Sequence, residues 1–390
     1  MRTPGWIPSA ALAALAVVLA GALAAFLMPG CDSKPGYPAS LEFPSRTDRL
    51  VLRIPTAQPK APGEPGKLEA ELAALDSLGG ETLDPEQLPV ESRAAIDAFL
   101  VETFGTPSAS SVNAELGVKL GLTPGTLQEG SRLYRRHCLQ CHGLTGDGRG
   151  PTGQWIYPHP RDFRRGAFKF VSTGDGGKPR KTDLARTLRD GLKGTGMPAF
   201  GLLPDSERDA LATYVMFLSL RGQTEFLALK SLASDEGSKP EEVARERLAL
   251  AMIDWEKAER VGLPIPKPPP DDAVKQSPEH LGAVRRGFEL FSAKGTTDCA
   301  ACHEDYGRKA TYRFDVWGTV IRPAELTAGV FKGGDRPEDL FQRIRGGIQP
   351  VGMPAHPSLS EAQVWELVWF VRALPFPREL PDDVRAKVYP

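Results

Sequence analysis

The pentapeptide Cys-x-x-Cys-His occurs twice in this chain of 390 residues, at 138–142 and at 299–303. This pattern is the covalent attachment motif of c-type haem. On a short helix, two cysteines three residues apart face the same way and can both bond the porphyrin, while the adjacent histidine reaches the iron. A zinc site or a redox dithiol is the alternative, but structural zinc takes four donors and each cluster offers three. The motifs therefore predict two covalently bound haem c groups.

Each motif is followed at a similar distance by the tetrapeptide Gly-Met-Pro-Ala. Met197 stands 55 residues after His142, and Met353 stands 50 residues after His303. Glycine and proline exclude these methionines from helix interiors, so we expect both in loops. A thioether there suits the distal face of a small haem domain and raises its reduction potential. We predict Met197 and Met353 as the sixth iron ligands, with His356 as the alternative ligand in the second domain.

The residues around both motifs resemble class I cytochrome c, repeated in tandem. Gly130-x-x-Leu133-Tyr134 precedes the first motif, and Gly287-x-x-Leu290-Phe291 precedes the second. The patterns Tyr214-Val215-x-x-Leu218 and Phe370-Val371-x-x-Leu374 each begin 17 residues after the methionine. Such an internal repeat indicates two similar domains, at about residues 122–222 and 280–376. The resemblance implies that the first and last helices cross at Gly130 and Tyr214, and at Gly287 and Phe370.

Further residues recur at matching places in the two repeats. Gly166-x-Phe168-Lys169 parallels Gly329-x-Phe331-Lys332, and a tryptophan follows each histidine. Residues at these places often hold haem propionates, because arginine and tryptophan N–H groups satisfy buried carboxylates. The candidates are Trp155, Trp317, Arg161 and Arg322. The alternative is core tryptophans with surface arginines.

The second repeat departs from the first in one respect. It has four extra residues between its glycine and its first cysteine, and 292–298 has the composition of a loop. Outside the motifs, we expect His159 to contact solvent or a propionate and His280 to lie on the surface.

The N-terminus predicts export and attachment to a membrane. An uncharged apolar run extends from Trp6 to Met28, which is long enough to cross a bilayer. Haem is attached to c-type apocytochromes outside the cytoplasm, so export is required. Cys31 follows Gly30 as at a bacterial lipoprotein cleavage site. We expect the periplasmic face of the bacterial cytoplasmic membrane, with an uncleaved helix or lipidated Cys31 as the anchor; simple secretion is the third alternative.

The predicted fold class is mainly α, with two class I cytochrome c-like helical domains in tandem. Proline-rich stretches and helical periodicity separate the remaining parts. The predicted parts are residues 1–31, an anchor or signal; 32–120, a proline-rich tether with short helices at 67–78 and 89–104; 121–222, the first cytochrome c domain; 223–279, a linker with one helix at 240–261; 280–376, the second cytochrome c domain; and 377–390, a C-terminal tail.

Charge is uneven along the chain, although the net charge is −1. Residues 121–222 contain 16 Lys and Arg against 9 Asp and Glu, whereas 32–120 contain 8 against 14. A basic first domain predicts docking to an acidic redox partner. An evenly solvated surface, or cover by the acidic N-terminal segment, is the alternative. Nucleic acid is not expected, because no groove-reading motif is present.

The predicted function is electron transfer without catalysis and without a diffusible small-molecule substrate. The chain is expected to relay single electrons between a quinol-oxidising complex or dehydrogenase and a haem-copper terminal oxidase. The predicted cofactor-binding residues are Cys138, Cys141, His142 and Met197 for one haem, and Cys299, Cys302, His303 and Met353 for the other. One alternative is a di-haem peroxidase-like enzyme, which needs an open sixth position and acid–base residues. A haem c subunit of a periplasmic dehydrogenase is another.

Overall fold

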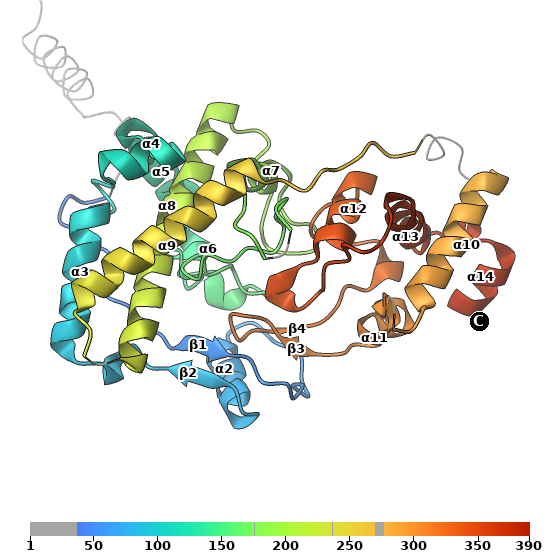
Figure 1. Ribbon diagram of the computed structural model, residues 1–390, viewed down its shortest axis with the longest axis horizontal. Helices are drawn as coiled ribbons and strands as arrows, with labels where there is room; N and C mark the ends of the chain where they lie inside the picture. Colours follow the sequence, from blue (N-terminus) through green and yellow to red (C-terminus); the bar gives the residue numbers. More distant parts are fainter. Residues whose placement is uncertain (1–36, 175, 236, 270–276, 296) are drawn as a thin grey trace, which may run out of the picture. The chain divides into compact units, whose positions relative to one another are not determined.

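Helices dominate the computed structural model, which describes residues 37–390 except 175, 236, 270–276 and 296 (Figure 1). The mainly helical fold class is confirmed. Within the described ranges, no helix is both long and apolar enough to cross a membrane. The expected anchor, Trp6–Met28 with Cys31, lies outside the described residues.

The described elements follow one another as short helices separated by loops. The helices are α2 (Leu68–Ser77), α3 (Val90–Phe104), α4 (Ala114–Leu120), α5 (Pro124–His137), α6 (Leu139–His142), α7 (Lys181–Asp190), α8 (Asp205–Ser234), α9 (Pro240–Arg260), α10 (Pro278–Ser292), α11 (Cys299–Cys302), α12 (Pro337–Gly346), α13 (Glu361–Ala373) and α14 (Asp382–Val388). Strand β1 (Leu50–Arg53) pairs antiparallel with β2 (Glu81–Leu83), and β3 (Arg313–Phe314) pairs antiparallel with β4 (Val320–Ile321).

The first repeat is built on the crossing of α5 and α8. Thr123 caps α5 by accepting a hydrogen bond from the Thr126 N–H, and Pro124 fits its first turn. A Cβ on Gly130 would lie 2.7 Å from the Tyr214 Cβ, so only glycine allows the two helices to approach this closely. The predicted crossing at Gly130 and Tyr214 is confirmed.

The second repeat has the same crossing between α10 and α13. Ser360 and Gln363 form a reciprocal capping box that starts α13. A Cβ on Gly287 would lie 2.8 Å from the Phe370 Cβ and closer still to the Glu366 carbonyl oxygen. The predicted crossing at Gly287 and Phe370 is confirmed as well.

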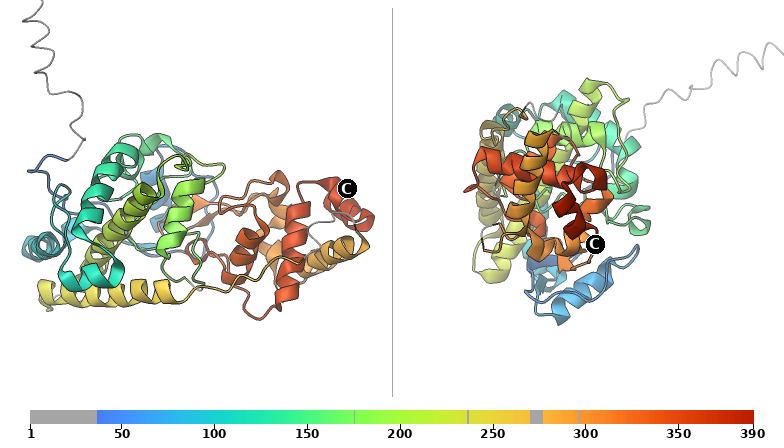
Figure 2. Two further views of the ribbon diagram at one scale, coloured as in Figure 1. Left: turned by 90° about the horizontal axis from the view of Figure 1, so that it is seen from above. Right: turned by 90° about the vertical axis from the view of Figure 1, so that its right-hand side faces the viewer.

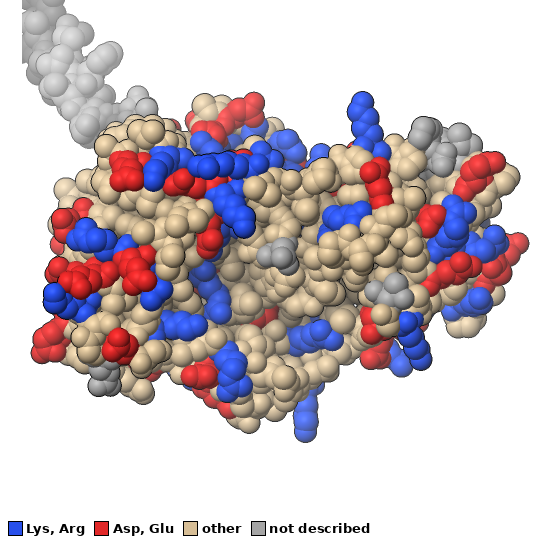
Figure 3. Space-filling model, in the orientation of Figure 1, with Lys and Arg blue, Asp and Glu red and all other residues tan. Residues whose placement is uncertain are grey.

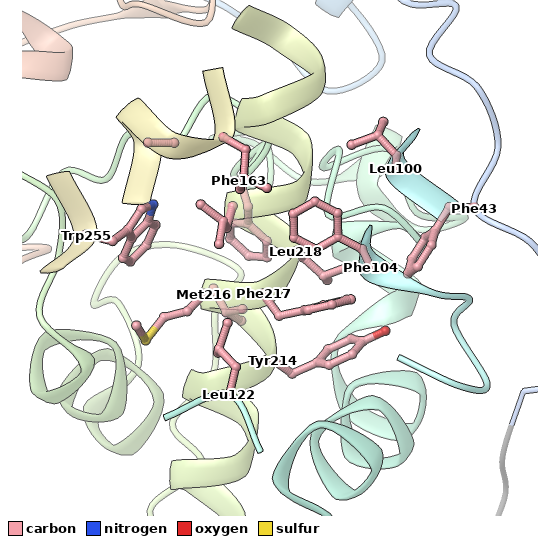
Figure 4. Packing of buried hydrophobic residues seen from close by; sticks show 14 of the residues in the cluster. Phe43, Leu100, Phe104, Leu122, Phe163, Tyr214, Met216, Phe217, Leu218 and Trp255 are labelled. Carbon is pink, nitrogen blue, oxygen red and sulfur yellow. The ribbon is translucent and has the colours of Figure 1, made fainter. Parts of the chain in front are cut away.

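Segments outside the repeats complete the core of the first repeat. The Phe104 ring of α3 packs edge-on against Phe217 of α8 at 5.7 Å, and Phe43 contacts the same ring at 6.4 Å (Figure 4). On another side, α9 packs against α8 (Figure 2). This packing buries Trp255, whose Nε1–H donates to the Gln223 side chain at 3.3 Å. The helices predicted at 67–78, 89–104 and 240–261 are present as α2, α3 and α9.

The proline-rich segment after residue 36 packs against the rest of the protein, unlike the extended tether that its composition predicts. The buried Arg164 guanidinium binds both carboxylate oxygens of Asp48, at 2.7 and 2.8 Å. Asp162 takes a further hydrogen bond from the same guanidinium at 2.9 Å. Such bidentate pairs fix geometry strongly, so the segment is attached to the first repeat.

The same N-terminal segment also reaches the second repeat. A small apolar cluster joins Val51, Leu72 and Leu75 to Phe314 and Val320 of the β3–β4 hairpin. The backbone N–H of Val320 donates to the buried carboxylate of Glu71 at 2.9 Å. The hairpin is therefore held by residues that precede the first repeat in the sequence.

Direct contacts join the two repeats, through the equivalent helices α7 and α12. Arg343 of α12 donates to the Val171 carbonyl at 2.9 Å, and Arg186 of α7 donates to the Gln342 side chain at 3.3 Å. Lys193 pairs with Asp335 at 2.6 Å beyond the ends of these helices. The sequence left open whether the two repeats touch.

The residues predicted as a C-terminal tail belong to the core of the second repeat. Val384 and Val388 of α14 are fully buried in its apolar cluster. Arg285 of α10 binds the Asp383 carboxylate at 2.7 Å. The sequence prediction missed this helix because its seven residues carry a short apolar pattern.

Candidate haem sites

The first Cys-x-x-Cys-His motif lies at the junction of α5 and α6, with Cys138 between the two helices. The Cys138 N–H bonds the Tyr134 carbonyl at 2.8 Å, and the His142 N–H bonds the Cys138 carbonyl at 2.9 Å. This helical spacing places Cys138 and Cys141 on one side. Burial raises the pKa of the Cys138 thiol to about 12, an environment that suits a neutral thioether better than a metal-bound thiolate. The described residues contain no cluster of three donors fit for a metal ion.

His142 is held in one tautomer by the backbone. Its Nδ1–H donates to the Arg161 carbonyl at 3.2 Å, because a carbonyl can only accept. The ring stacks on Phe163 with centroids 4.7 Å apart. Burial lowers the pKa of His142 to about 4, so the imidazole is neutral. The Nε2 lone pair is therefore available for an iron, as required of a proximal ligand.

The second motif has the same histidine bond on a less regular backbone. The Nδ1–H of His303 donates to the Ala324 carbonyl at 3.1 Å. Burial also lowers the pKa of His303 below its ordinary range. However, α11 ends at Cys302, and Asp298 before it has φ of 52°, in the left-handed region. This irregularity falls where the second repeat has its extra residues.

The two predicted methionine ligands lie in loops of the same construction. Met197 follows α7 and Met353 follows α12, and both side chains are half-buried. At the end of each helix, Gly191 and Gly347 have φ of 66° and 67°. A Cβ on either glycine would lie 2.7 Å from the N–H nitrogen of the alanine in Gly-Met-Pro-Ala. The glycine thus allows the methionine loop to fold back against its helix.

Met197 packs against the apolar cluster that contains Cys138 and Phe163. The predicted methionine ligand and the first Cys-x-x-Cys-His motif therefore share one core. In the second repeat, Cys299 packs against the corresponding cluster. His356 follows Met353 in its loop, with its backbone N–H bonded to the Arg345 carbonyl at 3.2 Å. The ligand roles of Met197 and Met353 remain predictions.

Buried positive charge gathers where the two repeats meet. Arg161 and Lys169 both lie beside the buried Asp315 carboxylate, at 3.5 and 3.1 Å. Burial, with the nearby Arg161 charge, lowers the pKa of Lys169 to about 8. Burial also lowers the pKa of Lys332, which Arg322 and Arg161 lower further. Cations exceed acids in this cluster, so it fits additional carboxylates such as haem propionates.

The four residues proposed as propionate contacts have different environments. Trp317 is 9% exposed and Trp155 is 72% exposed. Arg161 stacks on the Trp317 ring with its Cζ 3.6 Å from the centroid. The half-exposed Arg322 pairs loosely with Glu325 at 3.9 Å. Arg161 of the first repeat thus contacts Trp317 of the second repeat.

The other histidines differ partly from expectation. His280 was predicted on the surface, which is wrong: it is 4% exposed and faces the Trp369 ring at 6.0 Å. The N-terminal position of α10 misled the prediction, because α13 covers that turn. His159 has a buried side chain, with Nε2 3.5 Å from the Glu71 carboxylate.

The sequence did not reveal the two carbonyls that orient the histidines. A backbone carbonyl carries no residue identity, so Arg161 and Ala324 gave no direct signal for this role. Phe163, stacked on His142, was visible only as part of the repeated segment that contains Asp162 and Phe163.

Surface charge is mixed on the face seen in Figure 3, where basic and acidic side chains are interspersed. Several cations of the first repeat pair with the acidic N-terminal segment, including Arg149 with Glu69 at 2.8 Å and Arg164 with Asp48 at 2.7 Å. For these arginines, the structure favours cover by that segment over a free basic docking surface.

Comparison with known proteins points to the same two repeats. The family described as cytochrome C oxidase, cbb3-type, subunit III matches residues 125–215 and 282–371. Among solved structures, a chain of the Kuenenia stuttgartiensis reducing HAO-like protein complex is 26% identical, covers 63% of this chain and 96% of that chain, and has a TM-score of 0.46. No curated protein matches the sequence. Each family match contains one Cys-x-x-Cys-His motif.

Proposed function

Because the chain carries two cytochrome c domains in tandem, we propose that it binds two haem c groups and relays single electrons between redox proteins. Thioether bonds to Cys138 and Cys141 attach one haem, which His142 and Met197 ligate. Cys299 and Cys302 attach the other, which His303 and Met353 ligate. The bound haem supplies an iron that takes up and returns one electron.

One observation carries this proposal: in both domains the histidine of the motif donates its Nδ1–H to a backbone carbonyl, at 3.2 and 3.1 Å. A histidine fixed in this tautomer presents Nε2 as a ligand and keeps its ring orientation. The pairing occurs twice, at equivalent places in the repeat. A chance structural role for both histidines does not account for that recurrence.

The proposed ligands favour electron transfer. Met197 and Met353 would each hold an iron together with the histidine of their domain, and a methionine ligand would raise the reduction potential. Cys138 and Cys299 pack against apolar clusters, which would limit changes in hydration on electron transfer. A methionine ligand in each domain would leave no open position of the kind that peroxide chemistry needs.

The proposed setting is the periplasmic face of the cytoplasmic membrane, with residues 1–31 as the anchor. Haem attachment outside the cytoplasm supports export, and the apolar run Trp6–Met28 supports anchoring. The proposed donors are a quinol-oxidising complex or a dehydrogenase. The proposed acceptor is a haem-copper oxidase, which the matched family's description as a cytochrome c oxidase subunit supports.

Absorption spectra of the haem-loaded protein test this function. They are recorded oxidised and reduced, with and without carbon monoxide and hydrogen peroxide. We expect two low-spin haems that react with neither molecule. A haem that binds carbon monoxide, or is oxidised by peroxide with turnover, would contradict the relay function and support the peroxidase-like alternative.

A further inference from the structure

We propose that the turn Asp315–Thr319 of the second cytochrome c domain conducts electrons between the two haems, with Trp317 as its central residue. This inference rests on the proposed function, because it requires a haem in each domain. The turn connects β3 to β4 and lies against the first domain. Three hydrogen bonds make it a continuous path between the two sites.

The Trp317 side chain is anchored in the first domain. Its Nε1–H donates to the Asp162 carbonyl at 2.9 Å. The Arg161 guanidinium lies over the indole ring at 3.6 Å, and the Lys169 ammonium lies over it at 5.7 Å. Cations over an aromatic face stabilise this placement. The equivalent tryptophan of the first domain, Trp155, is not buried in this way and is 72% exposed.

The anchor of Trp317 is adjacent to the iron-facing histidine of the first domain. Asp162 directly follows Arg161, whose carbonyl accepts the Nδ1–H of His142 at 3.2 Å. The two accepting carbonyls belong to consecutive residues, so only the backbone from the Arg161 carbonyl to the Asp162 carbonyl separates these two hydrogen bonds. The imidazole of one site is thus linked to an aromatic ring of the other domain.

On its other side, the turn is linked to the methionine loop of its own domain. The Val316 N–H, next to Trp317, donates to the Pro350 carbonyl at 3.0 Å. Pro350 precedes Met353 by three residues, in the loop after α12. The complete path runs from His142 through Arg161, Asp162, Trp317 and Val316 to Pro350 and Met353.

The turn is rigid, which a conduit requires. The Asp315 carboxylate accepts hydrogen bonds from the backbone N–H groups of Trp317 and Thr319, both at 3.1 Å. Its other oxygen lies 3.1 Å from the Lys169 ammonium. On the outer side, Gly318 packs against Leu72 of the N-terminal segment. Electrons tunnel faster through bonds and hydrogen bonds than across gaps, so a fixed chain favours this path.

The step moves one electron and no atoms. One electron leaves a ferrous iron, which becomes ferric, and reduces the ferric iron of the other haem to ferrous. No covalent bond forms or breaks, no proton is transferred, and the indole is neither oxidised nor reduced. The relative potentials of the two haems set the direction.

The test measures electron exchange between the haems in the full haem-loaded chain. A laser flash injects one electron, and the absorption change follows its redistribution. Trp317→Phe keeps the ring but removes the Nε1–H donor, and Trp317→Leu removes the ring. Phe376→Leu is the matched control, because Phe376 is a 54% exposed aromatic side chain that lies outside this path. Spectra, midpoint potentials and small-angle scattering are recorded for every variant.

We expect a loss of exchange rate in both Trp317 variants, larger for Trp317→Leu, with spectra, potentials and scattering unchanged. The Phe376→Leu variant should exchange electrons at the wild-type rate. An unchanged rate in Trp317→Phe would overturn the proposal. A rate loss accompanied by separated domains would overturn it too, because Trp317 would then only hold the domains together. Absence of two low-spin haems in the wild-type protein would instead refute the proposed function.

Discussion

The two cytochrome c domains share the arrangement of their predicted haem ligands but differ in what surrounds them. The first domain is covered by α3 and α9, which bury Phe104 and Trp255 against α8. The second domain adds α14 to its own helices, and the N-terminal segment packs against its β3–β4 hairpin. Yet Trp155 of the first domain is exposed, whereas Trp317 of the second domain is buried, because Trp317 lies against the first domain. A repeat in sequence therefore predicts shared chemistry, whereas neighbouring segments decide which surfaces remain exposed.

The largest expected effect is a fall in haem reduction potential, of similar size in both domains, when the predicted methionine ligand is removed. Met197→Ala and Met353→Ala should each lower the potential of the haem in that domain by on the order of 0.1 V, since axial ligands shift haem potentials over about 0.8 V. Redox titration followed by absorption measures both. Met216→Leu is the control, because Met216 is a buried core residue and this substitution should leave both haem reduction potentials unchanged. A potential that responds to His356→Ala but not to Met353→Ala would break the symmetry.

Trp255→Ala should destabilise the first domain selectively. Removing a fully buried aromatic side chain costs about 3–5 kcal/mol in free energy of unfolding. Urea unfolding followed at haem absorption measures this cost. The control is Trp155→Ala at an exposed position, which should change stability by less than about 0.5 kcal/mol. Equal effects of the two variants would refute the distinct roles assigned to the two tryptophans.

Substitution of the glycine at each helix crossing should destabilise both domains alike, and by less than Trp255→Ala destabilises the first domain. Gly130→Ala and Gly287→Ala each place a methyl group against the crossing helix, at about 1–3 kcal/mol of destabilisation. Thermal unfolding of the haem-loaded variants checks this. Gly125→Ala is the control in α5, because a Cβ there meets nothing within 4 Å. If Gly130→Ala is as harmless as Gly125→Ala, the close crossing is absent.

The smallest expected effect is a pH dependence from Lys169. Burial, together with Arg161, lowers its pKa from 10.5 to about 8 in the folded protein. At pH values between these two pKa values, the unfolded chain binds more protons than the folded chain. The free energy of unfolding therefore rises with pH over this interval. Burial of Lys178, whose pKa is also lowered to about 8, adds to the same slope.

Lys169→Met should therefore reduce the slope of stability against pH above about 8, leaving the part that Lys178 contributes. Urea unfolding at several pH values measures it. Lys309→Met, at an exposed position, should retain the wild-type slope. A wild-type stability that falls over this interval would contradict the burial of these lysines.

The sequence predicted what depends on local pattern. The Cys-x-x-Cys-His and Gly-Met-Pro-Ala segments located the candidate ligands, and the repeated glycine and aromatic residues located the helix crossings. Helical periodicity located α2, α3 and α9. These features depend on residue types at fixed spacing, so one chain is enough to reveal them.

Packing between distant segments was not predictable in the same way. Asp48 binds Arg164 across more than a hundred residues, and composition alone indicated an extended tether there. The burial of His280 depends on α13, and that of Trp317 depends on the first domain. Such contacts depend on three-dimensional placement, for which a local pattern carries no signal.

Near-infrared magnetic circular dichroism of the oxidised, haem-loaded chain identifies the pair of axial ligands at each low-spin haem. We predict histidine–methionine ligation at both irons, from His142 with Met197 and from His303 with Met353. A histidine–histidine signal from one haem, or a high-spin signal, would show that the two sites are not equivalent electron-transfer sites.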